Sequence, residues 1–203
     1  LFDFYKGADN EKRKGPVRVL ASGLISVSEM KLGIFIVFFF SFILGLYLVY
    51  TAGLIILLIG VLSIIAGIAY TAGPFPLAYK GLGDVASFIF FGLVGTVGTF
   101  YLHTNEISLI ALLTSLPVGA LITNILVVNN YRDIEEDKAA GKNTLAVKLG
   151  KTFSRYEFIF FNILSFLIPL VLYLQYGFGN CIFLTYILIP PAFILTRMLY
   201  THD

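Results

Sequence analysis

The sequence has few of the residues that support disulfides, zinc sites or a soluble surface. Its one cysteine, Cys181, lies inside an apolar run and excludes an internal disulfide. The two histidines, His103 and His202, lie far apart, and no Cys/His spacing indicates zinc. Only 13% of the 203 residues are charged and 58% are hydrophobic, whereas soluble domains average about 25% charged residues. The composition therefore predicts a membrane protein, because a soluble chain of this size could not bury so much apolar surface.

The chain also lacks an initiator Met and a signal peptide. Residues 1–31 are polar and charged, so we expect the chain to begin inside a larger open reading frame. The net charge of +2 is small and does not indicate a nucleic-acid partner. We expect no nucleic acid partner.

Apolar runs near the length of about 20 residues that crosses a bilayer recur along the chain. They predict an all-α fold, a polytopic transmembrane helical bundle with six spans. The polar segments between the runs alternate between long (71–84, 129–152) and short (51–53, 103–106, 175–180). The expected spans are Leu32–Tyr50, Leu54–Tyr70, Val85–Leu102, Ile107–Val128, Phe153–Leu174 and Cys181–Thr196.

The charged residues are distributed unevenly between the two sides of this predicted bundle. All 14 Lys and Arg residues fall before the first span, in the long loops, at the start of the fifth span or after the sixth. These segments share one side of the membrane, which the positive-inside rule makes cytoplasmic. Of the 12 acidic residues, only Glu106 lies on the other side. A face with both signs of charge suits a metal and anion site better than a basic lipid-binding patch. We expect the protein to lie in the cell inner (plasma) membrane.

Glycine and proline interrupt several of the expected spans. Gly92, Gly95 and Gly98 follow one another at intervals of three, and Pro117 and Pro169 lie within later spans. We interpret the glycines as positions of close helix packing and the prolines as kinks.

Two acidic clusters lie at cytoplasmic ends of the expected spans. The first contains Asp3 and Asp9 and continues into a basic stretch that ends at Arg18. The second runs from Asn129 to Lys142. A charged loop at a helix end is more often merely solvated, but two such clusters on one membrane face favour a shared site.

The second cluster has helical spacing. Asp133 and Asp137 are four residues apart, and Asn130 lies three before Asp133. If the helix of the fourth span continues, these three side chains share one face, and Glu135 and Glu136 lie on other faces.

Carboxylates on a shared face repel each other unless a cation or a base lies between them. Mg²⁺ bridges one or two carboxylates to substrate phosphate oxygens in many sites. We therefore interpret the clusters as a site for a diphosphate held by Mg²⁺ and basic side chains, with the apolar tail among the helices. Some of the 20 Phe and 12 Tyr rings could stabilise an allylic carbocation, although lipid-facing and interfacial positions account for most of them.

The two clusters resemble the motifs of one family. Asp3-Phe-Tyr-Lys-Gly-Ala-Asp9 resembles the end of the first aspartate-rich motif of the UbiA superfamily of intramembrane prenyltransferases, and Asn130-x-x-Asp133-x-x-x-Asp137 resembles the second. The resemblance covers essentially the whole chain, which we take as a single transmembrane prenyltransferase domain, residues 1–203, incomplete at both ends. Segments similar to the 1,4-dihydroxy-2-naphthoate polyprenyltransferase branch are Gly15–Gly23, Tyr70–Tyr79, Leu82–Asp84, Phe90–Gly95 and Gly141–Ala146.

The resemblance implies an activity and a set of site residues. The activity is Mg²⁺-dependent transfer of a polyprenyl group from its diphosphate to 1,4-dihydroxy-2-naphthoate, giving demethylmenaquinone with release of carbon dioxide and diphosphate. The implied catalytic metal ligands are Asp3, Asp9, Asp133 and Asp137, assisted by Asn130. The bases assigned to the diphosphate are Arg18, Arg132 and Lys142, with Lys80 as a weaker candidate.

The sequence departs from the family at both ends. The Asn-Asp pair that opens the first motif would fall just before Leu1, and the family has further helices before this point and after Asp203. We therefore expect the chain as given to be inactive alone. Two alternatives remain: a sister enzyme with another acceptor (4-hydroxybenzoate, homogentisate, chlorophyllide or haem) and, less favoured, a membrane transporter, whose polar sites tend to lie near the bilayer midplane.

Overall fold

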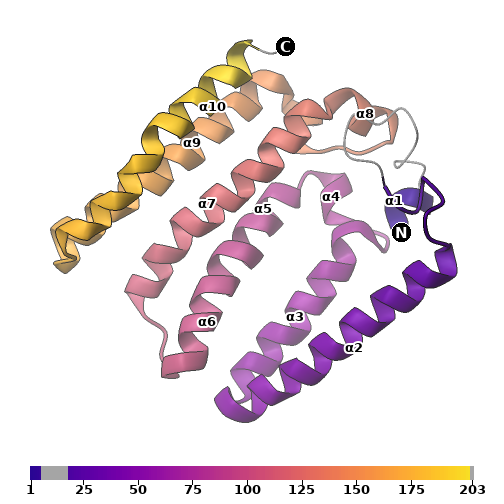
Figure 1. The fold of residues 1–203 in the computed structure, drawn as a ribbon, viewed down its shortest axis with the longest axis horizontal. Coiled ribbons are helices and arrows are strands. Elements are labelled where there is room, and N and C mark those ends of the chain that lie inside the picture. The colour runs from indigo at the N-terminus through magenta and orange to yellow at the C-terminus, as the bar shows by residue number, and fades with distance from the viewer. Residues whose placement is uncertain (6–17, 202–203) are drawn as a thin grey trace.

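The computed structural model describes residues 1–5 and 18–201. In this part of the chain all regular structure is helical. The long helices lie side by side in chain order, from α2 at one edge of the view to α10 at the other (Figure 1). The helices are α1 (Phe2–Tyr5), α2 (Val27–Ala52), α3 (Leu54–Thr71), α4 (Leu77–Lys80), α5 (Gly83–Ser87), α6 (Gly95–Thr104), α7 (Leu109–Arg132), α8 (Ile134–Ala139), α9 (Leu145–Tyr176) and α10 (Ile189–Thr201).

Six helical stretches among the described residues are long and apolar enough to cross a membrane. They confirm the predicted all-α bundle and coincide with the six expected spans, with ends that differ by at most eight residues; the fourth begins two residues later than expected, at Leu109. Successive stretches run in opposite directions (Figure 1), so the ends that carry the basic loops lie together. The stretches are Val27–Ala52, Leu54–Thr71, Gly83–Thr104, Leu109–Arg132, Leu145–Tyr176 and Asn180–Thr201.

The first span begins earlier than its apolar run because a capping box starts the helix. The Ser26 side chain accepts a hydrogen bond from the Glu29 backbone N–H at 3.2 Å, and the Ser26 N–H donates to the Glu29 carboxylate at 2.7 Å. This reciprocal pair satisfies two of the N–H groups that a helix start leaves without partners. Residues 27–31 therefore belong to α2, although Ser28, Glu29 and Lys31 make this segment too polar for a hydropathy-based boundary.

Helix α7 is the centre of the packing. In an apolar stretch of 18 residues 39% of the α7 residues are buried, whereas a stretch of the same length in α2 has none buried. It packs against α9 and against the π-helical segment Phe88–Val94 that joins α5 to α6. A small core of Val127, Tyr131, Phe158 and Leu199 lies between α7, α9 and α10.

Glycine allows the close approach of α7 to the third span. A Cβ built on Gly92 would lie 2.5 Å from the Cα of Gly119, closer than such atoms approach in proteins. Small residues let membrane helices pack backbone to backbone, which confirms the packing interpretation of Gly92. At Gly98, which is buried, an added Cβ would meet no described atom within 4 Å, so the described residues show no close helix contact there.

Two spans contain irregular helical geometry. The sixth span begins as a 3₁₀ segment, Asn180–Leu188, before α10, and α9 is interrupted at Gly150, whose φ is +81°. Pro117 and Pro169 lie inside α7 and α9, as expected.

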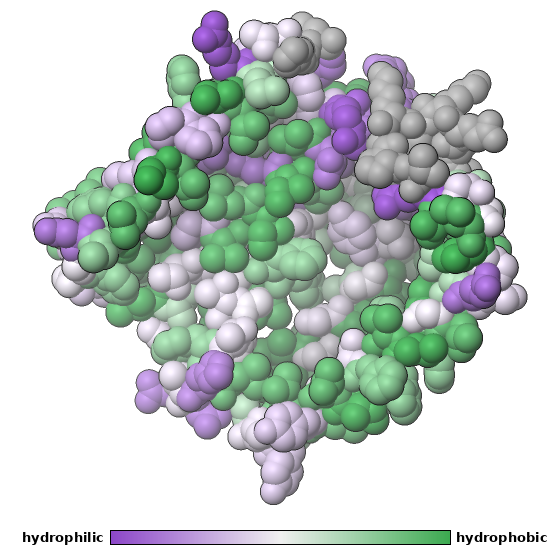
Figure 2. Space-filling model, viewed as in Figure 1, coloured by the Kyte–Doolittle hydropathy of each residue, from purple (hydrophilic) through white to green (hydrophobic). Residues whose placement is uncertain are grey.

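Most apolar side chains face outward. Hydrophobic residues cover the middle of the helices, and hydrophilic residues gather mainly at the helix ends (Figure 2). This arrangement suits a hydrocarbon solvent, in which outward apolar side chains carry no hydrophobic penalty and backbone polar groups are satisfied within helices.

Candidate active site

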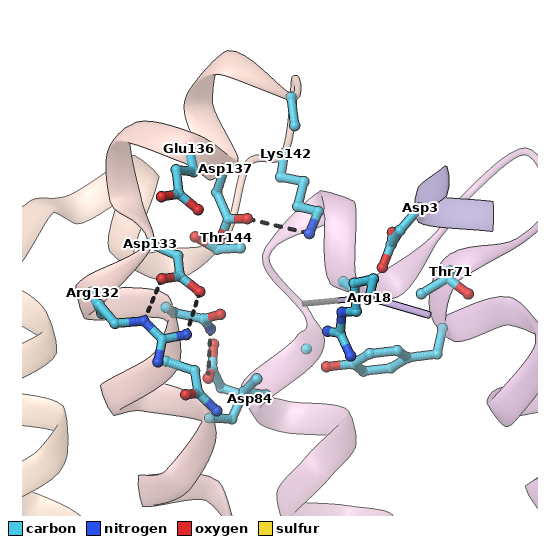
Figure 3. A pocket seen from close by; sticks show the side chains of 17 residues that line it. Asp3, Arg18, Thr71, Asp84, Arg132, Asp133, Glu136, Asp137, Lys142 and Thr144 are labelled. Carbon is cyan, nitrogen blue, oxygen red and sulfur yellow. Dashed lines mark hydrogen bonds and ion pairs between the residues drawn. The ribbon is translucent and has the colours of Figure 1, made fainter. Parts of the chain in front are cut away.

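A cavity of about 430 Å³ opens where α3, α4, α5 and the α7–α8 junction meet. Figure 3 shows the side chains of the second acidic cluster on one side of this cavity and Asp3 and Arg18 on the other. Among the described residues its lining carries two more acidic than basic groups, so the cavity suits a cation. The acidic lining residues are Asp3, Asp84, Asp133, Glu136 and Asp137, and the basic ones are Arg18, Arg132 and Lys142.

Asp133 lies at a break between two helices. Helix α7 ends at Arg132, and Asp133 takes φ −97° and ψ 15° before α8 begins. Its buried carboxylate accepts two hydrogen bonds from the neighbouring Arg132 guanidinium, at 2.5 and 2.7 Å. The planar guanidinium matches both carboxylate oxygens, and this pairing places one acid and one base at the cavity wall.

Asp137, in α8, pairs with a base in the loop that follows this helix. Its carboxylate lies 3.2 Å from Lys142 Nζ, and its backbone carbonyl accepts from the Lys142 N–H at 2.8 Å. Burial raises the pKa of the Asp137 carboxyl above its ordinary value, Lys142 opposes this shift, and Asp133 and Asp3 add to it. Asp3 therefore lies within electrostatic range of the second cluster.

Asn130 donates a hydrogen bond to a buried acid outside the second cluster. Its side-chain amide N–H donates to Asp84 Oδ1 at 3.2 Å, and Asp84, at the start of α5, is only 3% exposed. With the amide nitrogen on Asp84, the Asn130 carbonyl oxygen is left as an acceptor. The sequence pattern predicts no role for Asp84, although it is the only acid between residues 30 and 105.

Asp3 of the first cluster lines the cavity and is hydrogen-bonded to a tyrosine beside it. The hydroxyl of Tyr79, in α4, donates to Asp3 Oδ1 at 2.7 Å. Tyr70 and Thr71, from the end of α3, also line the cavity. Tyr70 and Tyr79 belong to a segment similar to the family, but their spacing alone gives no reason to place them at the acids.

The structure brings most of the predicted site residues to one cavity. The residues that line it are Asp3, Arg18, Asn130, Arg132, Asp133, Asp137 and Lys142. Lys80 does not line it: this residue is exposed, with its Nζ 5.7 Å from the centre of the Phe75 ring. Asp9 lies outside the described residues.

The predicted position of Glu136 was wrong. Glu136 lines the cavity beside Asp133 and Asp137, whereas Glu135 is exposed and lines a separate apolar groove between α7, α9 and α10. The reason lies in the spacing: Glu136 follows Asp133 by three residues, as Asp133 follows Asn130, and residues three apart share a helix face.

The donor chemistry of the cavity fits a hard divalent cation. Carboxylate oxygens and one amide oxygen converge there, and Mg²⁺ prefers such ligands. Within the described residues no three His, Cys, Asp or Glu side chains come close enough to form a metal cluster by themselves. In addition, Asp133 and Asp137 each already bind a base.

The spans and the charged cavity together define an integral membrane protein with a polar site at the ends of its helices. The chain belongs to the UbiA prenyltransferase family, whose model matches residues 1–203.

Several relatives are similar to much of the chain. A 1,4-dihydroxy-2-naphthoate octaprenyltransferase of Haemophilus influenzae is 43% identical over 73% of this chain and 50% of its own length. The Escherichia coli protein of the same name is 40% identical over 75% of this chain and 52% of its own length. UbiA prenyltransferase domain-containing protein 1 of Gallus gallus is 31% identical over 100% of this chain and 60% of its own length. The chain thus spans about half the length of the bacterial relatives. No solved structure matches the chain.

Proposed function

We propose that the whole protein transfers a polyprenyl group from polyprenyl diphosphate to 1,4-dihydroxy-2-naphthoate, releasing diphosphate and carbon dioxide and giving demethylmenaquinone. The observation that carries this proposal is the convergence of Asp3 with Asp133 and Asp137 on one cavity. Two bacterial relatives named for this octaprenyl transfer, at 43% and 40% identity, support the choice of acceptor.

The cavity supports diphosphate binding through groups of both signs. Arg18, Arg132 and Lys142 supply donors for phosphate oxygens. The carboxylates would repel a diphosphate alone, so the proposal includes Mg²⁺ held by Asp3, Asp133 and Asp137, with the Asn130 carbonyl oxygen as a further donor. When bound, Mg²⁺ supplies Lewis-acid stabilisation of the departing diphosphate. Asp9 is part of the proposed ligand set by its motif alone.

The proposed chemistry is an ionisation followed by an electrophilic substitution. The allylic C–O bond breaks and its electron pair leaves with the diphosphate, where the three basic side chains stabilise the developing charge. A ring carbon of the acceptor then attacks the allylic cation, a C–C bond forms and the bond to the carboxylate breaks, releasing carbon dioxide. Tyr70 lines the cavity, and an aromatic face stabilises a nearby cation.

The location of the charged cavity distinguishes this function from transport. Residues that line the cavity come from the ends of α3 and α7 and the start of α5. These helix ends lie on the side of the basic loops (Figure 1), whereas transporter sites tend to lie near the midplane. We place this face on the cytoplasmic side of the inner (plasma) membrane because of its Lys and Arg residues.

The test is an acceptor panel with the full-length protein in lipid nanodiscs. One polyprenyl diphosphate is supplied with 1,4-dihydroxy-2-naphthoate, 4-hydroxybenzoate, homogentisate, chlorophyllide or haem, and products are separated by mass. We expect transfer to the naphthoate, with release of carbon dioxide. Preferred transfer to another acceptor would overturn the assignment of substrate. Absence of transfer to all acceptors, together with solute flux in proteoliposomes, would overturn the enzymatic function.

A further inference from the structure

Tyr79 lies between the two acidic clusters. It belongs to α4, a single helical turn that follows Pro76 and ends at Gly81, and it is only 7% exposed. Gly81 takes φ +80°, and a Cβ there would lie 2.9 Å from the backbone oxygen of Asn143. Only glycine combines this left-handed conformation with so close an approach. The turn is therefore pressed against the loop of the second cluster.

The hydroxyl of Tyr79 is hydrogen-bonded to the first cluster. It donates to Asp3 Oδ1 at 2.7 Å. An ionised carboxylate has about four acceptor positions on its two oxygens, so this single bond orients Asp3 and leaves acceptor positions for a cation in the cavity.

The ring and backbone of Tyr79 contact the second cluster and the residue that follows it. Lys142 Nζ lies 5.4 Å from the ring centre, within the range of a cation–π contact, and the same ammonium pairs with Asp137 at 3.2 Å. The Tyr79 carbonyl also accepts from the Asn143 N–H at 3.0 Å. One residue thus contacts Asp3 from the first cluster, Lys142 from the second, and Asn143 directly after the second.

We propose that Tyr79 is a positioning residue that joins the two aspartate clusters into one binding site for a divalent cation and a diphosphate. Its hydroxyl orients Asp3, and its ring holds Lys142 against Asp137. This inference rests on the proposed function for its ligands, but it concerns binding and can be tested without prenyl transfer.

The decisive variant is Tyr79→Phe in the full-length protein, because it removes the hydroxyl and keeps the ring and the backbone bond. Binding of Mn²⁺, a paramagnetic substitute for Mg²⁺, is measured by electron paramagnetic resonance with inorganic diphosphate present. We expect Mn²⁺ affinity to fall by roughly 10–100-fold, the effect of losing a hydrogen bond to a charged group. Tyr79→Leu, which also removes the ring from Lys142, should weaken diphosphate binding further.

Tyr131→Phe is the matched control. Tyr131 is also 7% exposed, its hydroxyl donates to the Leu199 carbonyl at 2.9 Å, and its ring lies 5.6 Å from Lys151 Nζ. It does not line the charged cavity. Losing its hydroxyl should change thermal stability without changing Mn²⁺ affinity, so the pair separates positioning from general packing.

A double-mutant cycle tests whether Tyr79 acts through Asp3. If it does, Tyr79→Phe should have almost no further effect on Mn²⁺ affinity in an Asp3→Asn background. Additive losses, or equal effects of Tyr79→Phe and Tyr131→Phe, would overturn the proposal even if wild-type protein transfers prenyl groups. Conversely, the variants could show the expected changes in Mn²⁺ affinity while the wild-type protein transfers prenyl groups to no acceptor. That result would support the positioning role of Tyr79 and overturn the proposed function.

Discussion

Replacing Asp137 with Asn should reduce turnover much more than it reduces stability. Asp137 is buried, and its carboxylate lies 3.2 Å from Lys142 Nζ. Asn has nearly the same size, so packing is retained while one negative charge facing the cavity is lost. Asp133→Asn makes the same change at the acid bound to Arg132.

The structure sets the scale of the two effects. The Lys142 side chain is 20% exposed and remains partly solvated without its partner, so the free energy of unfolding should fall by about 1–3 kcal/mol. In the proposed reaction each acid acts on the departing diphosphate through the bound cation. Losing one such transition-state contact lowers the rate by roughly 10²–10³, or about 2.7–4 kcal/mol. The activity loss should therefore exceed what a small loss of folded protein explains.

The assay is single-turnover prenyl transfer to 1,4-dihydroxy-2-naphthoate by purified full-length variants, with folding checked by thermal melting. Glu135→Gln is the control, because Glu135 is exposed in the same short helix and lies outside the charged cavity. Glu136→Gln should show an intermediate effect, since Glu136 lines the cavity. Near-normal transfer by both Asp133→Asn and Asp137→Asn would refute the mechanism, and equal small losses at all four acids would indicate a solvated loop.

Three further substitutions and one metal experiment test other parts of the structure. Chelation should abolish transfer and added Mg²⁺ should restore it; activity that persists in excess chelator would contradict the metal requirement. Asp84→Asn should raise the Mg²⁺ concentration for half-maximal activity by roughly 10-fold, because it weakens the charge-assisted bond that orients Asn130; an unchanged Mg²⁺ titration would exclude this role. Gly92→Ala should lower the melting temperature, since its Cβ would lie 2.5 Å from the Gly119 Cα and overpacking costs about 1–3 kcal/mol. The Lys80→Ala variant should transfer prenyl groups at a near wild-type rate, and a large loss of this activity would show that Lys80 takes part in the site.

Local sequence determines where the spans lie and that the basic loops share one side of the membrane. Apolar runs identify membrane helices whatever their neighbours, because every backbone polar group in hydrocarbon must be satisfied within its own helix. The same holds for the second cluster: Asn130, Asp133 and Asp137 recur at helical spacing, and backbone bonds from Asp133 to Asn129 and from Asp137 to Asp133 keep them on one side despite the break. Sequence reasoning therefore identified these elements and most of the cavity's charged residues.

Tertiary packing decided which side chains complete the cavity. Asp84 and Tyr79 lie in or beside short helices after α3, and only the fold brings Asp84 to Asn130 and Tyr79 to Asp3, across 46 and 76 residues of sequence. Lys80 belongs to the same single turn as Tyr79 but is exposed and does not line the cavity. A side chain's direction in such short elements depends on what they pack against, and the periodicity of one long helix carries no information about it.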